Sequence, residues 1–237
     1  PESFATGKEV SITNRTKHFP DGKGSNVIGL IEGNDPELKE EVILIGAHLD
    51  HLGKCWELIP GANDNASGVA VMMGVARALK EYEIGLKRSV LFLSFGAEEQ
   101  GIVGSKEYLK KPVFPLDQTV ALINLDGVGV GDKVGVTAGK NYPGLFEYVR
   151  QANAKYVHRQ VRPSNFLNIT RPRLDAARFM KAGVPILSLY SYGAPSVYHQ
   201  PGDDVDSITP EIMEDIAQML YMTVIEMAND QELIQKR

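Results

Sequence analysis

The sequence predicts a single α/β domain with a mixed, mostly parallel central sheet flanked by helices. Two observations carry this prediction. Four runs of residues, 42–47, 90–95, 120–125 and 184–190, are apolar almost throughout and rich in β-branched or aromatic side chains, which is typical of strands buried on both faces of a sheet. Segments between these runs place apolar residues at helical spacing, as in helices that cover such a sheet.

The first expected element is an antiparallel hairpin. Residues 8–13 and 26–32 alternate like edge strands, and the turn-forming run 21–24 lies between them. Between the first two buried strands, residues 66–82 are expected to form an amphipathic helix. Its apolar face collects Val69, Met72, Met73, Ala76 and Leu79.

A second strong helix is expected after Thr209, which can act as the N-cap before Pro210 at the first helical position and Glu211 in the first turn. Its apolar stripe consists of Ile212, Ile216, Met219, Leu220, Thr223 and Met227. Weaker helical patterns occupy residues 101–110, 144–155 and 175–181. No linker divides the chain, so residues 1–237 are expected to form one domain. Because it begins at Pro1 without an initiator Met or signal peptide, we expect it to be excised from a longer chain.

The composition excludes several classes of protein. With 43% hydrophobic and 23% charged residues, the 237-residue chain has an ordinary globular composition, and no apolar run approaches the ~18 residues of a transmembrane helix. A single cysteine excludes an internal disulfide framework and a cysteine-based zinc site. The net charge of −5 argues against nucleic acid as the main partner.

Potential metal ligands follow the expected strands. They lie after the first strand (His48 and Asp50), after the second (Glu98 and Glu99), after the third (Asp126), after the fourth (His199), and just before the first helix (Asp64). Because the carboxyl ends of parallel strands meet at one edge of a sheet, we expect these side chains to gather there.

Such a gathering of carboxylates requires positive charge, because several carboxylates within a few ångströms cannot all stay ionised alone. Histidine and carboxylate ligands without thiolate suit zinc, and also manganese or cobalt. Five ligands exceed what a single four-coordinate catalytic zinc requires. With one shared carboxylate they suit two ions instead.

The same residues resemble peptidase family M28, the zinc aminopeptidases. The resemblance covers roughly residues 25–230 and rests on five ordered motifs. They are Gly46-Ala47-His48-Leu49-Asp50-His51-Leu52-Gly53, Gly61-Ala62-Asn63-Asp64-Asn65-Ala66-Ser67-Gly68, Ala97-Glu98-Glu99-Gln100-Gly101, Asn124-Leu125-Asp126 and Tyr198-His199-Gln200-Pro201-Gly202-Asp203.

The resemblance implies two Zn²⁺ ions per chain and a role for each site residue. One zinc would be bound by His48 and Asp126, the other by Glu99 and His199, with Asp64 bridging both. Three further residues would act beside the metals: Glu98 as general base, Asp50 in orienting the His48 imidazole, and Tyr198 as a hydrogen-bond donor to the oxyanion. No role is assigned to His51.

Two departures from the family pattern affect the substrate pocket. Many members carry Ser-Asp-His where this chain has Leu174-Asp175-Ala176, and many have Met where this chain has Gly127. The side-chain specificity of the family therefore does not transfer directly to this chain.

Four functions remain open at this point. The leading one is zinc-dependent hydrolysis of the N-terminal peptide bond of a peptide substrate. The second is carboxypeptidase or dipeptidase cleavage, in which the basic stretch 150–181, with eight basic residues and one acid, receives a carboxylate. A single-zinc glutaminyl cyclase is disfavoured by His48, and a non-catalytic ectodomain is disfavoured by the complete ligand set.

Localisation and assembly are less determined. Relatives with the His-x-Asp-His-Leu-Gly version of the first motif are often exported, so a periplasmic, extracellular or lipoprotein-anchored location is expected. The sequence indicates neither the oligomeric state nor the group that would hold a substrate ammonium.

Overall fold

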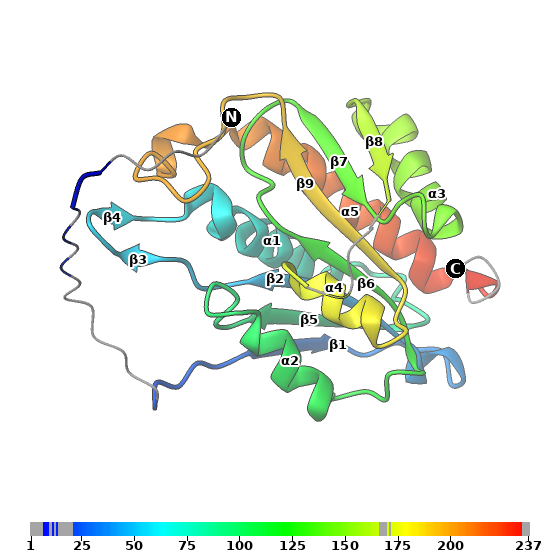
Figure 1. Cartoon of the computed structure of the whole chain (residues 1–237). Coiled ribbons are helices and arrows are strands. Elements are labelled where there is room, and N and C mark those ends of the chain that lie inside the picture. Colours follow the sequence, from blue (N-terminus) through cyan, green and yellow to red (C-terminus); the bar gives the residue numbers. More distant parts are fainter. Residues whose placement is uncertain are drawn as a thin grey trace.

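The computed structural model describes residues 7–9, 11, 13, 21–165, 170 and 172–233. Seven strands form one sheet in the order β1-β5-β2-β6-β9-β7-β8 (Figure 1). In that order the strands span Val27–Ile31, Ser89–Phe95, Val42–His48, Thr119–Leu125, Ile186–Tyr192, Lys133–Thr137 and Val161–Ser164.

The four predicted buried runs form the centre of this sheet and are parallel. β2 pairs with both β5 and β6, and β6 pairs with β9. Every residue of β2, β5 and β6 is buried, because helices cover both faces. The strands outside this group make the sheet mixed: β1 is antiparallel to β5, and β7 is antiparallel to β9.

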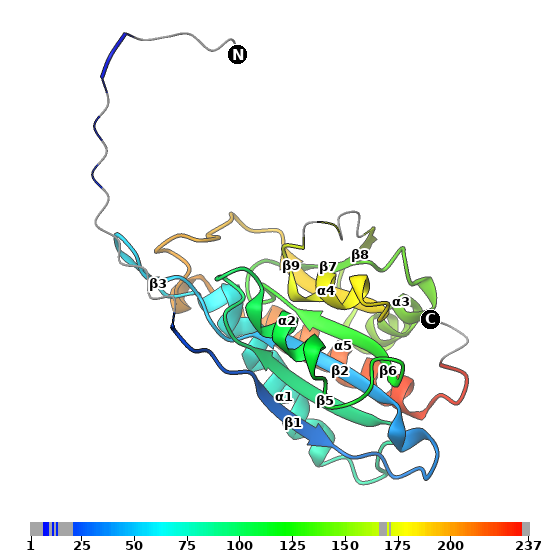
Figure 2. The ribbon, with the colours of Figure 1, turned by 60° about the horizontal axis from the view of Figure 1, so that its bottom comes forward.

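Five α-helices cover the sheet. They are α1 (Gly68–Lys80), α2 (Val103–Lys110), α3 (Pro143–Ala152), α4 (Asp175–Lys181) and α5 (Pro210–Asn229). One apolar cluster joins α1, α3 and α5 to the sheet, and a second joins α2 and α4 to it, so the two sets lie on opposite faces (Figure 2). The predicted helices and the mixed α/β fold class are thus confirmed.

The apolar stripe predicted for α5 is buried at all six positions. Thr209 is the N-cap residue, as expected, but its side chain makes no capping hydrogen bond. Its backbone N–H instead donates to the carbonyl of Gly129 at 2.8 Å. Of the predicted helix 144–155, only the part to Ala152 is α-helical, and it continues as a short π-helix, Asn153–Val157.

The predicted N-terminal hairpin needs correction. Positions 10 and 12 of its first strand, 8–13, lie outside the described residues, and positions 8, 9, 11 and 13 are not in a strand. The second strand exists as β1, but its partner is β5. β1 carries the exposed residues Val27, Ile28 and Leu30, and pairing with a buried central strand adds it to the main sheet.

The sequence patterns missed the short strands. β7 and β8 were not predicted, because Gly135 and Pro163 interrupt their patterns. A separate hairpin, β3 (Gly53–Lys54) and β4 (Leu58–Ile59), is only two residues long on each side. The remaining elements are a kinked helical segment at Ala62–Ser67 and 3₁₀ turns at Leu38–Glu40 and Val205–Ser207. Among the described residues, none of the helices has the length and apolarity needed to cross a bilayer.

Candidate metal centre

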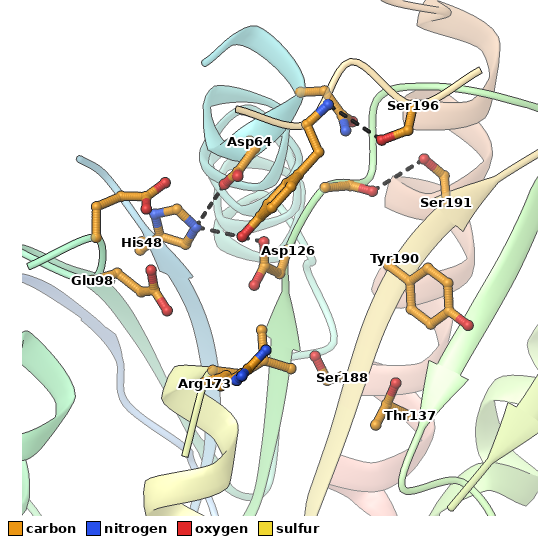
Figure 3. Close-up of a pocket in the computed structure, with 15 residues that line it drawn as sticks. His48, Asp64, Glu98, Asp126, Thr137, Arg173, Ser188, Tyr190, Ser191 and Ser196 are labelled. Atoms are coloured by element: carbon orange, nitrogen blue, oxygen red, sulfur yellow. Dashed lines mark hydrogen bonds and ion pairs between the residues drawn. The ribbon is translucent and has the colours of Figure 1, made fainter. Parts of the chain in front are cut away.

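The carboxyl edge of the sheet collects the predicted ligands. His48 is the last residue of β2, Asp126 directly follows β6, and Glu98 and Glu99 follow β5 by three and four residues. Asp64 lies in the irregular segment Ala62–Ser67 before α1, and its own φ and ψ are not helical. His48, Asp64, Glu98, Glu99 and Asp126 all line one pocket (Figure 3).

Two groups of ligand atoms form within this site. In the first, the His48 Nε2 atom lies 3.1 Å from Asp64 Oδ1 and 3.5 Å from Asp126 Oδ1. In the second, the His199 Nε2 atom lies 3.1 Å from Glu99 Oε1 and 3.4 Å from Asp64 Oδ2. The two oxygens of Asp64 therefore face different groups, as a bridging carboxylate requires.

The second group contains a fourth residue, His51, whose ligand atom lies within 4.8 Å of the others. His51 belongs to the first of the five motifs, which imply no role for it. Its signal was the sequence His-x-x-His at the end of a buried strand, which is too common to assign a ligand. Only the fold brings its ring against Glu99 and Asp64.

The electrostatics of the centre call for a cation. Burial disfavours the charged form of His48, but hydrogen bonds and charge from Asp126 and Asp64 outweigh it and raise the pKa of His48 to about 12. Burial would raise the pKa of Asp64, yet His48, His51 and His199 hold it below its ordinary value. The carboxylates around the buried imidazoles thus create a negative site that a divalent ion would neutralise. The set of histidine nitrogens and carboxylate oxygens suits zinc.

Glu98 differs from the ligands in its environment. Burial is the main cause that raises its pKa to about 8, and the neighbouring Asp175, Asp126 and Glu99 add to the effect while His48 opposes it. A carboxylate whose pKa lies near neutrality can both take up and release a proton. This property is what a general base that later acts as an acid needs.

Asp50 contacts His48 through its backbone. The Asp50 carbonyl oxygen lies 3.0 Å from His48 Nδ1, whereas the carboxylate is 4.0 Å away. The carboxylate instead accepts hydrogen bonds from the backbone N–H groups of Glu98 at 2.8 Å and Glu99 at 3.1 Å. The backbone carbonyl of Asp50 therefore contacts the imidazole, whereas its side chain holds the loop after β5.

Tyr198 lies at the rim of the pocket, with 62% of its surface exposed. Its ring stacks on His199 at a centroid distance of 3.7 Å. Burial of the hydroxyl, together with the charge of Asp64 and Glu99, raises the pKa of Tyr198 to about 12. The phenol is thus neutral at physiological pH and can donate a hydrogen bond.

The loops that carry these ligands are held by residues outside the ligand set. Asp203 is fully buried, and its carboxylate accepts hydrogen bonds from the backbone N–H groups of Asn63 at 2.6 Å and Asp64 at 3.0 Å. Ala97 and His199 have φ values of 54° and 56°, a left-handed conformation that non-glycine residues adopt rarely. The role of Asp203 was missed, although it belongs to the last motif.

The two departures from the family pattern also lie at the pocket. Gly127 has a φ of 66°, which glycine adopts without strain, and Leu174 lines the pocket. Asp175 and Ala176 are buried at the start of α4. The unusual residues therefore alter the wall of the pocket and leave the ligands in place.

Comparison with known proteins agrees with this geometry. The model of peptidase family M28 matches residues 26–224. The chain is 26% identical to aminopeptidase YwaD of Bacillus subtilis over 234 residues, covering 95% of this chain and 49% of that protein. It thus spans about half the length of this relative.

Solved structures show the same fold. An aminopeptidase from Aneurinibacillus sp. strain AM-1 is 26% identical with a TM-score of 0.73, covering 88% of this chain and 49% of that one. BSAP, a zinc aminopeptidase from Bacillus subtilis, is 25% identical with a TM-score of 0.72, covering 87% and 50%. Together with the family model and the ordered ligands on the sheet edge, these matches show that the chain belongs to peptidase family M28.

Proposed function

We propose that this chain is a zinc-dependent exopeptidase that hydrolyses the N-terminal peptide bond of peptides. The observation that carries the proposal is the pair of ligand groups joined through the two oxygens of Asp64, with Glu98 in the same pocket. The aminopeptidase names of the similar proteins support it.

The metal complement is part of this proposal. His48 and Asp126 would hold one Zn²⁺, Glu99 and His199 the other, and Asp64 would bridge them. Zinc held by these residues would polarise the peptide carbonyl and would lower the pKa of water toward neutrality.

The side chains would then manage protons and charge. Glu98 removes a proton from the attacking water and passes it to the leaving amine. Tyr198 donates a hydrogen bond to the oxyanion, a contribution of about 3–4 kcal/mol for a well-placed donor. Asp50 holds the His48 imidazole through its backbone carbonyl and holds the Glu98–Glu99 loop through its carboxylate.

A second function is favoured by Arg173. This residue lines the same pocket as His48 and Glu98 (Figure 3). Guanidinium groups bind carboxylates through two parallel hydrogen bonds. Arg173 would therefore suit the terminal carboxylate of a dipeptide or of a C-terminal residue, which keeps dipeptidase or carboxypeptidase cleavage as the alternative.

One substrate panel separates these functions. Aminoacyl anilides have a free amine but no terminal carboxylate. N-blocked peptides have a terminal carboxylate but no free amine, and dipeptides have both groups. We expect cleavage of anilides and dipeptides that zinc restores after chelation, and no cleavage of N-blocked peptides. Release of C-terminal residues from N-blocked peptides would overturn the proposal in favour of a carboxypeptidase, and cleavage of dipeptides alone would favour a dipeptidase.

The same panel tests the two remaining functions. A peptide that begins with glutamine would lose ammonia without chain cleavage if the protein were a glutaminyl cyclase. A protein that binds zinc but turns over none of these substrates would be a non-catalytic domain.

We also propose that the chain acts outside the cytoplasm, in line with the first motif of its exported relatives. Fractionation of the native host, with immunodetection of the chain, tests this location. Recovery of the chain in the cytoplasmic fraction alone would contradict it.

A further inference from the structure

His51 is a buried imidazole without a hydrogen-bond partner. Its side chain is 6% exposed. Among the described residues neither ring nitrogen has a hydrogen-bond partner, although Nδ1 lies within ion-pair distance of Glu99 and Asp64. The ring packs edge-on against His199 at a centroid distance of 5.5 Å. Gly61 makes room for it, because a Cβ atom at Gly61 would lie 2.4 Å from the His51 ring.

A buried polar group without a hydrogen-bond partner is rare in folded proteins and calls for an explanation. The Nδ1 atom of His51 lies 3.0 Å from Glu99 Oε1 and 4.0 Å from Asp64 Oδ2. The approach to Glu99 is as close as a hydrogen bond but lacks the geometry of one. Two ligand atoms of one metal ion are expected to lie this way, because both point toward the ion and not toward each other. They can therefore be close together without sharing a proton.

We propose that His51 is a ligand of the second zinc ion, together with Asp64, Glu99 and His199. This inference rests on the proposed dinuclear site and gives its two zinc ions different numbers of protein ligands. The second group then has four protein ligands, whereas the first has the three ligands His48, Asp64 and Asp126. The motifs alone imply a symmetrical site instead, in which each ion has two ligands of its own and shares Asp64 with the other ion.

The asymmetry predicts different tasks for the two ions. A zinc with four protein ligands has a closed, structural type of coordination, while a zinc with three keeps a position open for water or substrate. The His51 group should therefore bind its ion more tightly. The His48 group is the half that exchanges its ion and receives the substrate.

Zinc affinity of the purified chain tests this proposal without an activity assay. Chelator-buffered titration of the wild-type protein should resolve two ions whose affinities differ at least ~10-fold. Removal of a residue that hydrogen-bonds to a metal ligand lowers metal affinity by about 10–100-fold. Removal of a ligand itself, in His51→Ala, should therefore lower the affinity for the more tightly bound ion by ~100-fold or more. His48→Ala is the matched comparator and should weaken the other ion.

The outcomes separate this inference from the function on which it rests. Two wild-type affinities that stay unchanged in His51→Ala would overturn the ligand role of His51 and leave the dinuclear site standing. If the wild-type protein binds only one zinc ion and this binding is lost in His51→Ala, the ligand role of His51 would be supported and the proposed binding of two ions would be refuted. A wild-type chain that binds no zinc would overturn both proposals.

Should His51→Ala fail to fold, the wild-type protein provides a second measurement. The ring nitrogens of the histidines are followed by NMR as zinc is added, with His51 assigned by His51→Gln. Coordination should shift the His51 Nδ1 resonance at the first equivalent of zinc. An Nδ1 resonance that stays constant up to two equivalents would refute the proposal.

Discussion

The carboxylate of Asp50 accepts a hydrogen bond of 2.8 Å from the backbone N–H of Glu98. The second carboxylate oxygen binds the next backbone N–H, that of Glu99, at 3.1 Å. The end of β2 thus holds the loop after β5, on which both a proposed base and a proposed ligand lie. A charged acceptor that serves two adjacent N–H groups makes strong hydrogen bonds and sets the direction of the loop.

Asp50→Asn should therefore damage the reaction more than the binding of metal. An amide has only one oxygen, so its NH₂ group would face one of the two backbone N–H groups. We expect kcat to fall by about 10–100-fold while zinc content stays at the wild-type value, measured by steady-state kinetics and elemental analysis.

Asp35→Asn is the matched control. The Asp35 side chain also accepts two backbone N–H groups, from Glu37 and Leu38, both at 3.0 Å, but it lies before the first turn, Leu38–Glu40, and outside the pocket. Its kcat should equal that of the wild type. Equal losses in the two variants would show that the Asp50 contact has no special role in turnover.

Glu98→Ala should retain zinc and lose turnover. The proposed proton transfer contributes about 10²–10⁴-fold to the rate, so kcat should fall by several orders of magnitude. Glu107→Ala changes an exposed glutamate on α2 that pairs with Lys110 and should leave kcat unchanged. Wild-type turnover in Glu98→Ala would remove Glu98 from the mechanism.

Asp64→Ala should lose metal. Its two oxygens face different ligand groups, so both proposed ions lose a ligand at once, unlike in a variant of His48 or His199. Elemental analysis after gel filtration should find less zinc in Asp64→Ala than in His48→Ala. A full zinc content in Asp64→Ala would show that the carboxylate does not bridge.

The metal-free protein should become less stable as the pH rises from about 4 to about 7, in part because of Asp175. Burial is the main cause that raises the pKa of this carboxyl to about 7, above the value of about 3.9 for an exposed aspartate. Between these values the folded state keeps a proton that the unfolded state releases, so the stabilisation is present at low pH and lost as the pH approaches 7.

Asp175→Asn tests this dependence. The amide is uncharged at every pH, so the free energy of unfolding of the variant relative to the wild type should increase from pH 4 to pH 8, by a few kcal/mol. Urea unfolding in the presence of a chelator gives the values. A constant difference across this range would contradict the elevated pKa.

The buried strands of the central sheet could be predicted from local sequence patterns. Runs such as Val42–His48 are apolar at every position because both faces of the strand are covered, and this property is visible in the sequence. The places of His48 and Asp126 were predictable for the same reason, since the end of a parallel strand has a known place on the sheet edge.

The tertiary structure alone decided the finer contacts. The sequence contains His51 and Asp50 side by side, but only the fold places the His51 ring 3.0 Å from Glu99 Oε1 and turns the Asp50 carboxylate to the Glu98 backbone. Each contact joins residues almost fifty positions apart through a loop whose direction has no periodic signal. Strand and helix periodicity reports burial along one element, whereas the direction of a loop side chain depends on the distant elements packed around it.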